Sequence, residues 1–290
     1  MFSALRFLPK HNSVATKVRT FSSSTCQSQQ QSTKSAWKVG VIMSGCGYLD
    51  GTEITEAVST LIHLNKLDTD VVVYAPTGES VHTVNHNTEK VDIDEVRDIQ
   101  SEVSRITRGR VHSLNDCNAK ELDAIFFPGG YGVAKHLSNN YKPTEEGWSV
   151  NPQVEAIIQA AHKAKTPMGF FCVAPILAAR TLGTQYGGKG VTVTVGNNKQ
   201  TIKTVTQCGA KSVTTTTPDE VVVDEDNLIA STPAYMLSNA NHHEVFEGIG
   251  NCIEKVQAMF RKSDTSSSAI GNDPFVDGLF EEFVVPELKK

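Results

Sequence analysis

The sequence predicts an α/β fold: a doubly wound, mostly parallel sheet with helices on both faces. Short segments of continuous apolar residues recur between residues 37 and 260, and stretches with helical spacing of apolar side chains separate them. Strands that are apolar at every position are typical of a sheet covered on both faces. Alternation of such strands with helices indicates βαβ units, which produce parallel sheets. We therefore expect one domain over residues 36–260 of the 290.

The first half of this domain opens with a buried strand at residues 38–43 (KVGVIM). Residues 52–67 then carry apolar side chains on one stripe of a helix. A second strand is predicted at residues 70–75, where DVVVYA is ended by a proline. The elements that follow are a small hairpin at 82–91, a helix at 94–106, a strand at 124–127 and a short helix near 132–138.

The second half repeats the alternation of helix and strand. A helix is predicted at residues 151–165, a strand at 168–172 (MGFFC) and a short helix at 175–182, whose opening proline suits a first helical turn. The remaining elements are a strand at 191–195, a polar helix at 199–208, a hairpin at 221–231 turned at Asp226 and Asn227, and an amphipathic helix at 244–260.

The two ends of the chain differ from the domain in composition. Residues 1–35 contain no acidic residue, several Arg and Lys, and many Ser and Thr, which is typical of a mitochondrial transit peptide. A secretory signal fits worse because the apolar runs are short and interrupted by charges. We expect cleavage between Arg19 and Lys38 and import into the matrix. Residues 261–290 are predicted to be an acidic, flexible C-terminal extension.

Charge and cysteine content exclude several classes of function. The chain has a net charge of −5, and without residues 1–35 it has 22 basic against 32 acidic residues, or −10. Such a body has no general attraction for nucleic acid, and no segment is long and apolar enough to span a membrane. The six cysteines form no C-x-x-C pair and have no histidine at zinc spacing, so we predict neither a metal site nor a cofactor.

Unusual residues follow three of the predicted strands. They are SGCGYLDGTE after the first strand, FPGGYG at residues 127–132 and FFCVAP at residues 170–175. Parallel sheets carry their sites at the carboxyl ends of the strands, so these segments are expected to meet. Cys172 lies where a strand turns into a helix, and the helix N-terminus favours a thiolate, hence a nucleophile. The alternative is a buried cysteine that only packs.

Two further features of these strand ends suit catalysis. The Gly129-Gly130 pair lets backbone N–H groups approach a reacting oxygen, although a Pro-Gly-Gly segment also makes a simple turn. Glu53 begins the first helix, and a carboxyl near a thiol and away from water has a raised pKa that suits proton transfer. An acidic residue that only stabilises the helix start is the alternative for Glu53.

Together these segments resemble the ThiJ/PfpI superfamily of class I glutamine amidotransferase-like proteins. SGCGYLDGTEITEAV, RITRG, LDAIFFPGGYGVAKHLSN, GFFCVAP and VVDEDNLIASTPAYML are similar to its ElbB-type, glyoxalase-like branch, over residues 37–260. The resemblance implies a flavodoxin-like fold with Cys172 as nucleophile at a strand-to-helix elbow. It also implies that Glu53 touches the sulfur, that Gly129 and Gly130 supply an oxyanion site with Val173, and that the chain forms homo-oligomers.

One departure from the superfamily concerns histidine. Class I amidotransferases have a histidine partner for the cysteine, but the corresponding stretches here read VTVTVGNN and STPAY. Cleavage of an amide needs an acid for the amine, whereas thiolate addition to an aldehyde has no leaving group. The favoured hypothesis is therefore a cofactor-independent glyoxalase-like or deglycase-like enzyme that acts on α-oxoaldehydes or on glycated protein through a cysteine hemithioacetal. The alternatives are a redox-sensing protein that uses Cys172 and an amidotransferase-like subunit that needs a partner.

Other side chains are candidates for accessory roles. Cys46 lies between two glycines and is either a second thiol at the rim of the site or a residue kept for its small size. His136 follows the Gly-Gly turn and is the histidine expected nearest the pocket, with packing or hydrogen bonding favoured over catalysis. His242 and His243 are interpreted as solvated or capping residues.

Overall fold

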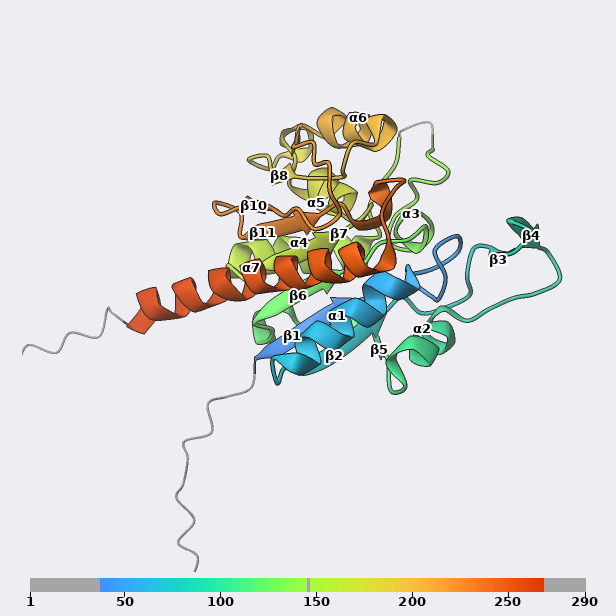
Figure 1. Cartoon of the computed structure of the whole chain (residues 1–290), viewed down its shortest axis with the longest axis horizontal. Helices are drawn as coiled ribbons and strands as arrows, with labels where there is room; N and C mark the ends of the chain where they lie inside the picture. The colour runs from blue at the N-terminus through green and yellow to red at the C-terminus, as the bar shows by residue number, and fades with distance from the viewer. Residues whose placement is uncertain (1–36, 145–146, 269–290) are drawn as a thin grey trace, which may run out of the picture. The chain divides into compact units, whose positions relative to one another are not determined.

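The computed structural model describes residues 37–144 and 147–268 and is built on one seven-stranded sheet (Figure 1). The strand order is β10-β11-β7-β6-β1-β2-β5, and every pairing is parallel except that of β10 with β11. The predicted α/β fold with a mostly parallel sheet is therefore confirmed. The strands are β1 (Lys38–Ile42), β2 (Asp70–Ala75), β5 (His112–Ser113), β6 (Ala124–Phe127), β7 (Met168–Phe171), β10 (Val222–Asp224) and β11 (Ile229–Thr232).

The strands are apolar throughout because both faces of the sheet are covered. In β6, Ile125 and Phe127 enter one hydrophobic core while Ala124 and Phe126 enter another on the opposite face. Successive side chains of a strand point to opposite faces, so each core receives every second residue. All four side chains of β6 are buried.

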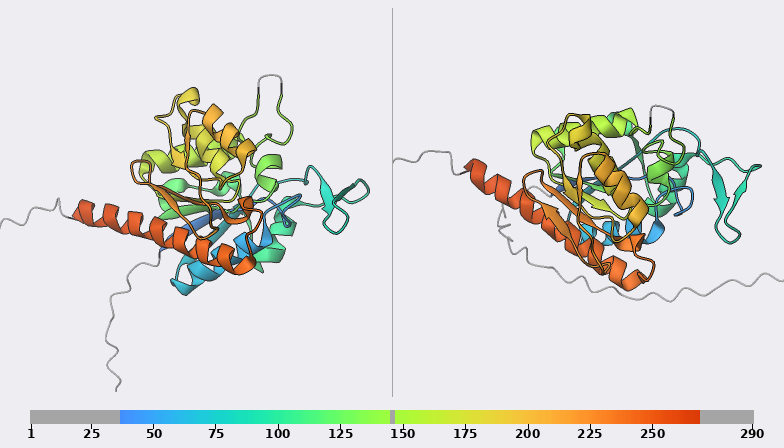
Figure 2. Two further views of the ribbon diagram at one scale, coloured as in Figure 1. Left: turned by 45° about the horizontal axis from the view of Figure 1, so that its top comes forward. Right: turned by 90° about the horizontal axis from the view of Figure 1, so that it is seen from above.

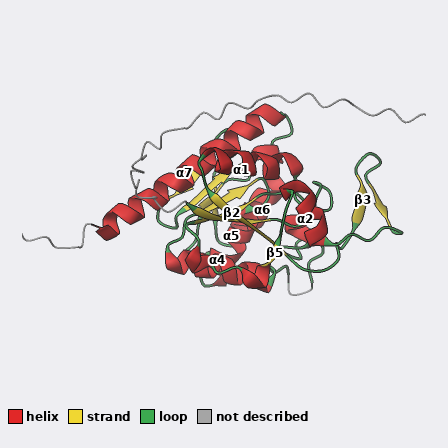
Figure 3. Ribbon diagram, turned by 90° about the horizontal axis from the view of Figure 1, so that it is seen from below, coloured by secondary structure: helices red, strands yellow, loops and turns green. Residues whose placement is uncertain are grey.

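Helices form a layer on each face of the sheet, as Figure 3 shows from below. The helices α1 (Ile54–Lys66), α2 (Ile99–Thr107) and α7 (His242–Ser268) bury apolar side chains in the core that contains Phe126. On the other face α4 (Pro152–Ala164), α5 (Pro175–Leu182) and α6 (Lys199–Gln207) pack into the core that contains Phe127. The short helix α3 (Gly132–Lys135) contributes Val133 to this second core.

The smaller elements lie outside the main sheet. The predicted hairpin forms from β3 (Thr83–Asn85) and β4 (Lys90–Asp92), and it projects from the helices and strands around it (Figure 2). The strand predicted at 191–195 is shorter, since β8 (Thr192–Val193) pairs only with β9 (Lys211–Ser212). Four 3₁₀ turns complete the described residues: Leu114–Asp116, Ala119–Glu121, Thr184–Tyr186 and Ala234–Met236.

The largest differences from the predicted helix bounds are at the start of α2 and at the end of α7. Helix α2 begins at Ile99 rather than at residue 94, because the Asp98 side chain accepts the N–H of Ser101 at 2.7 Å and caps the helix there. Helix α7 begins at His242 and continues beyond Phe260 to Ser268, into the segment predicted to be flexible. The predicted transit peptide and residues 269–290 lie outside the described residues. Among the residues that are described, no helix has the length and apolar character required to cross a membrane.

Candidate active site

Cys172 lies at the turn between β7 and α5, as the sequence predicts. Its backbone has φ 59°, a left-handed conformation, and its N–H donates to the carbonyl of Thr232 in β11 at 3.0 Å. A residue other than glycine adopts this conformation only when its surroundings impose it, and such strain is concentrated at functional sites. The side chain is only 7% exposed and lines a cavity of about 780 Å³.

The carboxyl that neighbours the Cys172 thiol belongs to Glu56. It is completely buried, and each of the two groups shifts the pKa of the other. The resemblance implied that Glu53 would hold this position, and that expectation is wrong. Glu53 caps helix α1, where its carboxylate accepts the N–H of Glu56 at 2.7 Å, and it therefore lies one helical turn before the residue that reaches the sulfur.

Helix α1 explains why Glu56 points inward. Its buried face includes Glu56, Thr60 and Leu64, which repeat at four-residue intervals and so lie on one side of the helix. The Glu56 carboxyl also accepts the backbone N–H of Gly129 at 2.7 Å. This bond fixes the carboxyl between α1 and the turn after β6, next to the sulfur.

The backbone around the sulfur supplies two hydrogen-bond donors. The N–H groups of Gly130 and Val173 lie near enough to the Cys172 sulfur to lower the pKa of its thiol. Gly129 does not belong to this set, because its N–H is used by Glu56. Gly130 has φ +96°, and a Cβ there would come within 2.5 Å of the backbone of Glu53 and Gly51. Only glycine fits at this position.

The protonation of Glu56 and Cys172 is set mainly by burial. Removal from water, followed by the nearby charge of Glu53, raises the pKa of Glu56 to about 8. Burial, followed by the charge of Glu56, raises the pKa of the Cys172 thiol, while the N–H groups of Gly130 and Val173 oppose that rise. Burial therefore opposes the thiolate that the sequence predicts for Cys172, while the N–H groups favour it.

Replacement of Glu53 by glutamine is expected to lower the pH at which Glu56 loses its proton. The charge of Glu53 is the second cause of the raised pKa of Glu56, and the glutamine removes that charge but keeps an oxygen to cap α1. The measurement is the pH dependence of Cys172 alkylation by iodoacetamide in both proteins. An unchanged midpoint in Glu53→Gln would show that the two carboxyls do not interact.

Glu53 faces the cavity that Cys172 lines, together with polar side chains from several elements. Burial raises the pKa of Glu53, while hydrogen bonds from Glu56 and Thr55 and the nearby His242 oppose the rise. Thus the cavity contains the thiol and a carboxyl, with Glu56 behind the thiol. The complete lining is Tyr48, Glu53, Gly130, Tyr131, Ala134, Asn140, Cys172, Val173, Asn198, Gln200, Thr201, Tyr235, Met236, Ser238 and His242.

The histidine in this cavity is His242, which the sequence interpretation set aside. It comes from the first turn of α7, and its Nδ1 is hydrogen-bonded to the hydroxyl of Tyr235, which also lines the cavity. Sequence spacing gives no sign of this approach, because the turn at Ala234–Met236 and the packing of α7 bring His242 to the cavity. The STPAY segment lacks a histidine but contributes Tyr235, the partner of His242.

His136 and Cys46 are absent from the cavity lining. His136 is buried, and its Nε2 accepts the N–H of Val81 at 3.1 Å, so Nδ1 donates to the carbonyl of Ser44 at 3.0 Å. His136 thus holds the loop after β1 against residue 81. This is a hydrogen-bonding role, which the sequence analysis favoured over catalysis. Cys46 is half-buried in the same loop, and burial raises the pKa of its thiol.

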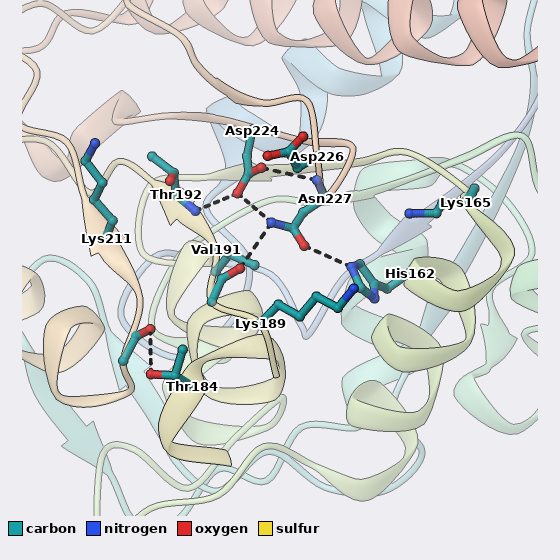
Figure 4. A pocket seen from close by; sticks show the side chains of 12 residues that line it. His162, Lys165, Thr184, Lys189, Val191, Thr192, Lys211, Asp224, Asp226 and Asn227 are labelled. Atoms are coloured by element: carbon teal, nitrogen blue, oxygen red, sulfur yellow. Dashed lines mark hydrogen bonds between the residues drawn. The ribbon is translucent and has the colours of Figure 1, made fainter. Parts of the chain in front are cut away.

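A second cavity of about 630 Å³ lies near the start of β7 (Figure 4). Lys165, shortly before this strand, lines it, whereas Cys172 follows the other end of the strand. Asn227 organises its wall by donating to Asp224 at 2.9 Å and to the carbonyl of Gly190 at 3.1 Å, and its side-chain oxygen lies 2.9 Å from Nε2 of His162. No cysteine lines it. Over the described ranges 37–144 and 147–268, no group of three His, Cys, Asp or Glu side chains is placed to hold a metal ion.

Comparisons with known proteins identify relatives over most of the chain. No family model matches. The chain is 36% identical over 234 residues to the mitochondrial ES1 protein homolog of Rattus norvegicus, covering 78% of this chain and 85% of the relative. It is 35% identical over 239 residues to the mitochondrial glutamine amidotransferase-like class 1 domain-containing protein 3 of Homo sapiens, with the same coverage of both chains.

The solved structures agree with these relatives. An isoprenoid biosynthesis protein with an amidotransferase-like domain from Ehrlichia chaffeensis superimposes with a TM-score of 0.68 at 30% identity, covering 76% of this chain and 99% of that one. Similarity of this extent, with two-thirds or more of each relative covered, confirms the resemblance to the ThiJ/PfpI superfamily. The chain belongs to the ES1 family of class I glutamine amidotransferase-like proteins, within that superfamily.

Proposed function

We propose that the chain is a cofactor-independent glyoxalase-like or deglycase-like enzyme that converts α-oxoaldehydes, free or as early adducts on proteins, through a hemithioacetal on Cys172. The observation that carries this proposal is the arrangement around the sulfur. A buried carboxyl neighbours the thiol and shifts its pKa, the N–H groups of Gly130 and Val173 favour the thiolate, and a second carboxyl lines the same cavity.

The first step is addition of the thiol to the aldehyde. The ionised form of Glu56, whose share grows as the pH approaches about 8, accepts the thiol proton as the sulfur forms a bond to the aldehyde carbon. The aldehyde oxygen takes the negative charge. The N–H groups of Gly130 and Val173 lie close enough to the sulfur to stabilise that oxygen. A thiol with a raised pKa needs such a base, because little thiolate is present at neutral pH.

The second step is a proton transfer between the two carbons of the adduct. Glu56 is buried behind the sulfur and does not line the cavity, whereas Glu53 does. Glu53 therefore removes the hydrogen from the carbon attached to sulfur and returns a proton to the neighbouring carbon. The oxygen on the first carbon becomes a carbonyl, and the oxygen on the second carbon takes a proton from solvent and becomes a hydroxyl. The product is a thioester of a 2-hydroxy acid, which water cleaves to release the acid and restore the thiol.

The size of the cavity supports substrates larger than a free aldehyde. At about 780 Å³ it falls within the range of sites for drug-sized ligands. Asn140, Asn198 and Gln200 provide amide groups for hydrogen bonding along its wall. A cavity of this size suits an aldehyde that is still attached to a protein amine better than it suits free glyoxal.

The raised pKa of Cys172 argues against the redox-sensing alternative, because the thiolate is the species that peroxide oxidises readily. The amidotransferase alternative keeps some support from His242, which supplies a histidine within the same chain. For location, we propose import into the mitochondrial matrix, supported by the acid-free residues 1–35 and by relatives that are named as mitochondrial.

The test is product formation from glyoxal by the full-length chain. Glycolate is measured by chromatography, with Cys172→Ala as the blank for non-enzymatic reaction with lysines and other thiols. The proposal predicts glycolate formation above this blank, without added metal or glutathione. Glyoxal consumption at the same rate in both proteins would contradict it, and ammonia release from glutamine would favour the amidotransferase alternative.

A further inference from the structure

One step of the proposed reaction needs a group that neither glutamate supplies well. After Glu53 returns its proton to the substrate, the thioester on Cys172 must be attacked by water, and that water needs a base. Glu56 already holds the proton of the thiol and lies behind the sulfur, away from the cavity. A group that lines the cavity together with Cys172 is better placed to activate water.

His242 occupies such a position. It lines the same cavity as Cys172 and Glu53, and its charge interacts with that of Glu53. The residue itself is exposed, so a proton that its ring accepts has a direct route to solvent.

Tyr235 sets the orientation of the His242 ring. Its hydroxyl is hydrogen-bonded to Nδ1 of His242 and also interacts with the side chain of Thr55. When this hydroxyl accepts Nδ1–H, the proton of the neutral ring is on Nδ1 and Nε2 is free to act as a base. The backbone N–H of Tyr235 faces Glu56, so the same residue connects the two ends of the site.

We propose that Nε2 of His242 is the base that activates the hydrolytic water, with Tyr235 as the residue that positions the ring. This inference rests on the proposed function. A water proton passes to Nε2 as the water oxygen bonds to the thioester carbon, and Gly130 and Val173 hold the resulting oxyanion. The carbon–sulfur bond then breaks, the sulfur takes back the proton from Glu56, and the imidazolium releases its proton to solvent.

The experiment compares single and multiple turnovers of glyoxal in the wild type and in His242→Gln. In the variant, Cys172 is expected to acylate at the wild-type rate, while steady-state turnover falls about 10²-fold. The thioester then accumulates on Cys172, where mass spectrometry detects it and hydroxylamine converts it to a hydroxamate. A hemithioacetal of the same mass gives no hydroxamate, so the step that has been slowed is identified.

Two further variants separate catalysis from structure. Tyr235→Phe is expected to accumulate the same thioester with a smaller loss of turnover, because the ring of His242 is retained but held less firmly. His243→Gln is the matched control, since His243 is exposed beside Glu247 and does not line the cavity, and it should turn over like the wild type.

The results distinguish this inference from the proposed function. If the wild type forms glycolate and His242→Gln does so at the same rate, or loses activity without accumulating a thioester, the role of His242 is overturned and the proposed function stands. If the wild type forms no glycolate, the proposed function fails, and the role of His242 fails with it.

Discussion

Cys172→Ala is expected to reduce the formation of 2-hydroxy acid by at least about 10³-fold, to the level of the uncatalysed reaction. The sulfur forms the covalent bond to the aldehyde, so the hemithioacetal and the thioester cannot form without it. The remaining groups of the cavity still bind the substrate but have no adduct on which to move a proton. Steady-state formation of glycolate from glyoxal measures the effect.

The control for this prediction is Cys117→Ala. Cys117 is half-buried against the core, lines neither of the two cavities and has a thiol whose pKa is raised to about 12 by burial alone. Its replacement should leave turnover unchanged. Equal loss in both variants would indicate that turnover depends on stability and not on the sulfur of Cys172.

Glu56→Gln is expected to reduce turnover by about 10²- to 10⁴-fold, the usual contribution of a positioned acid–base group. The glutamine oxygen can still accept the N–H of Gly129, which Glu56 accepts at 2.7 Å, so the geometry of the turn is retained. The proton acceptor for the thiol is lost. Glu254→Gln, an exposed change in α7, is the matched control and should be active.

The same variant has an opposite effect on stability. The pKa of Glu56 is raised in the folded state to about 8, above the ordinary value near 4.5, so folding favours the protonated carboxyl. Its contribution to stability is complete below about pH 4.5 and is lost as the pH rises through about 8. Glu56→Gln should therefore unfold at a higher temperature than the wild type at pH 9, with a smaller difference at pH 5. A lower melting temperature at both values would contradict this assignment.

The architecture can be predicted from the sequence because strands that are apolar at every position indicate a sheet that is buried on both faces. The strand 124–127 and the helix 175–182 match β6 and α5 residue for residue. The carboxyl ends of β1, β6 and β7 meet because parallel strands bring them to one edge of the sheet, which is why Cys172, Gly130 and Glu53 were predicted together.

The exchange of Glu53 for Glu56 shows that similarity to a motif does not identify which of two nearby glutamates lies next to the thiol. Glu53 and Glu56 both lie in the quoted motif, one helical turn apart, and the resemblance alone does not choose between them. The helical spacing of Glu56 with Thr60 and Leu64 is a signal that was available, since it places a carboxyl on the buried stripe of α1. The protonation of Cys172 was not accessible, because burial depends on the packing of the whole site.

The position of His242 in the cavity could not be predicted from the sequence, for a different reason. Its position depends on where the turn after β11 leads the chain and on how α7 packs against α1 across the sheet face. Neither feature is local to the motif that contains Cys172. Long-range packing of this kind has no periodic signature in the sequence.

The central claim is that Glu56 accepts the thiol proton of Cys172, and the pH dependence of Cys172 alkylation by iodoacetamide tests it most directly. Modification of the peptide that contains Cys172 is followed by mass spectrometry from about pH 6 to about pH 10. In the wild type, the rate should rise with a midpoint near pH 8, where Glu56 ionises and can accept the thiol proton. In Glu56→Gln, the midpoint should move to higher pH, because the buried thiol must then ionise without a base. A midpoint at the same or lower pH in the variant would contradict the claim, since Glu56 would then act only as a charge that repels the thiolate.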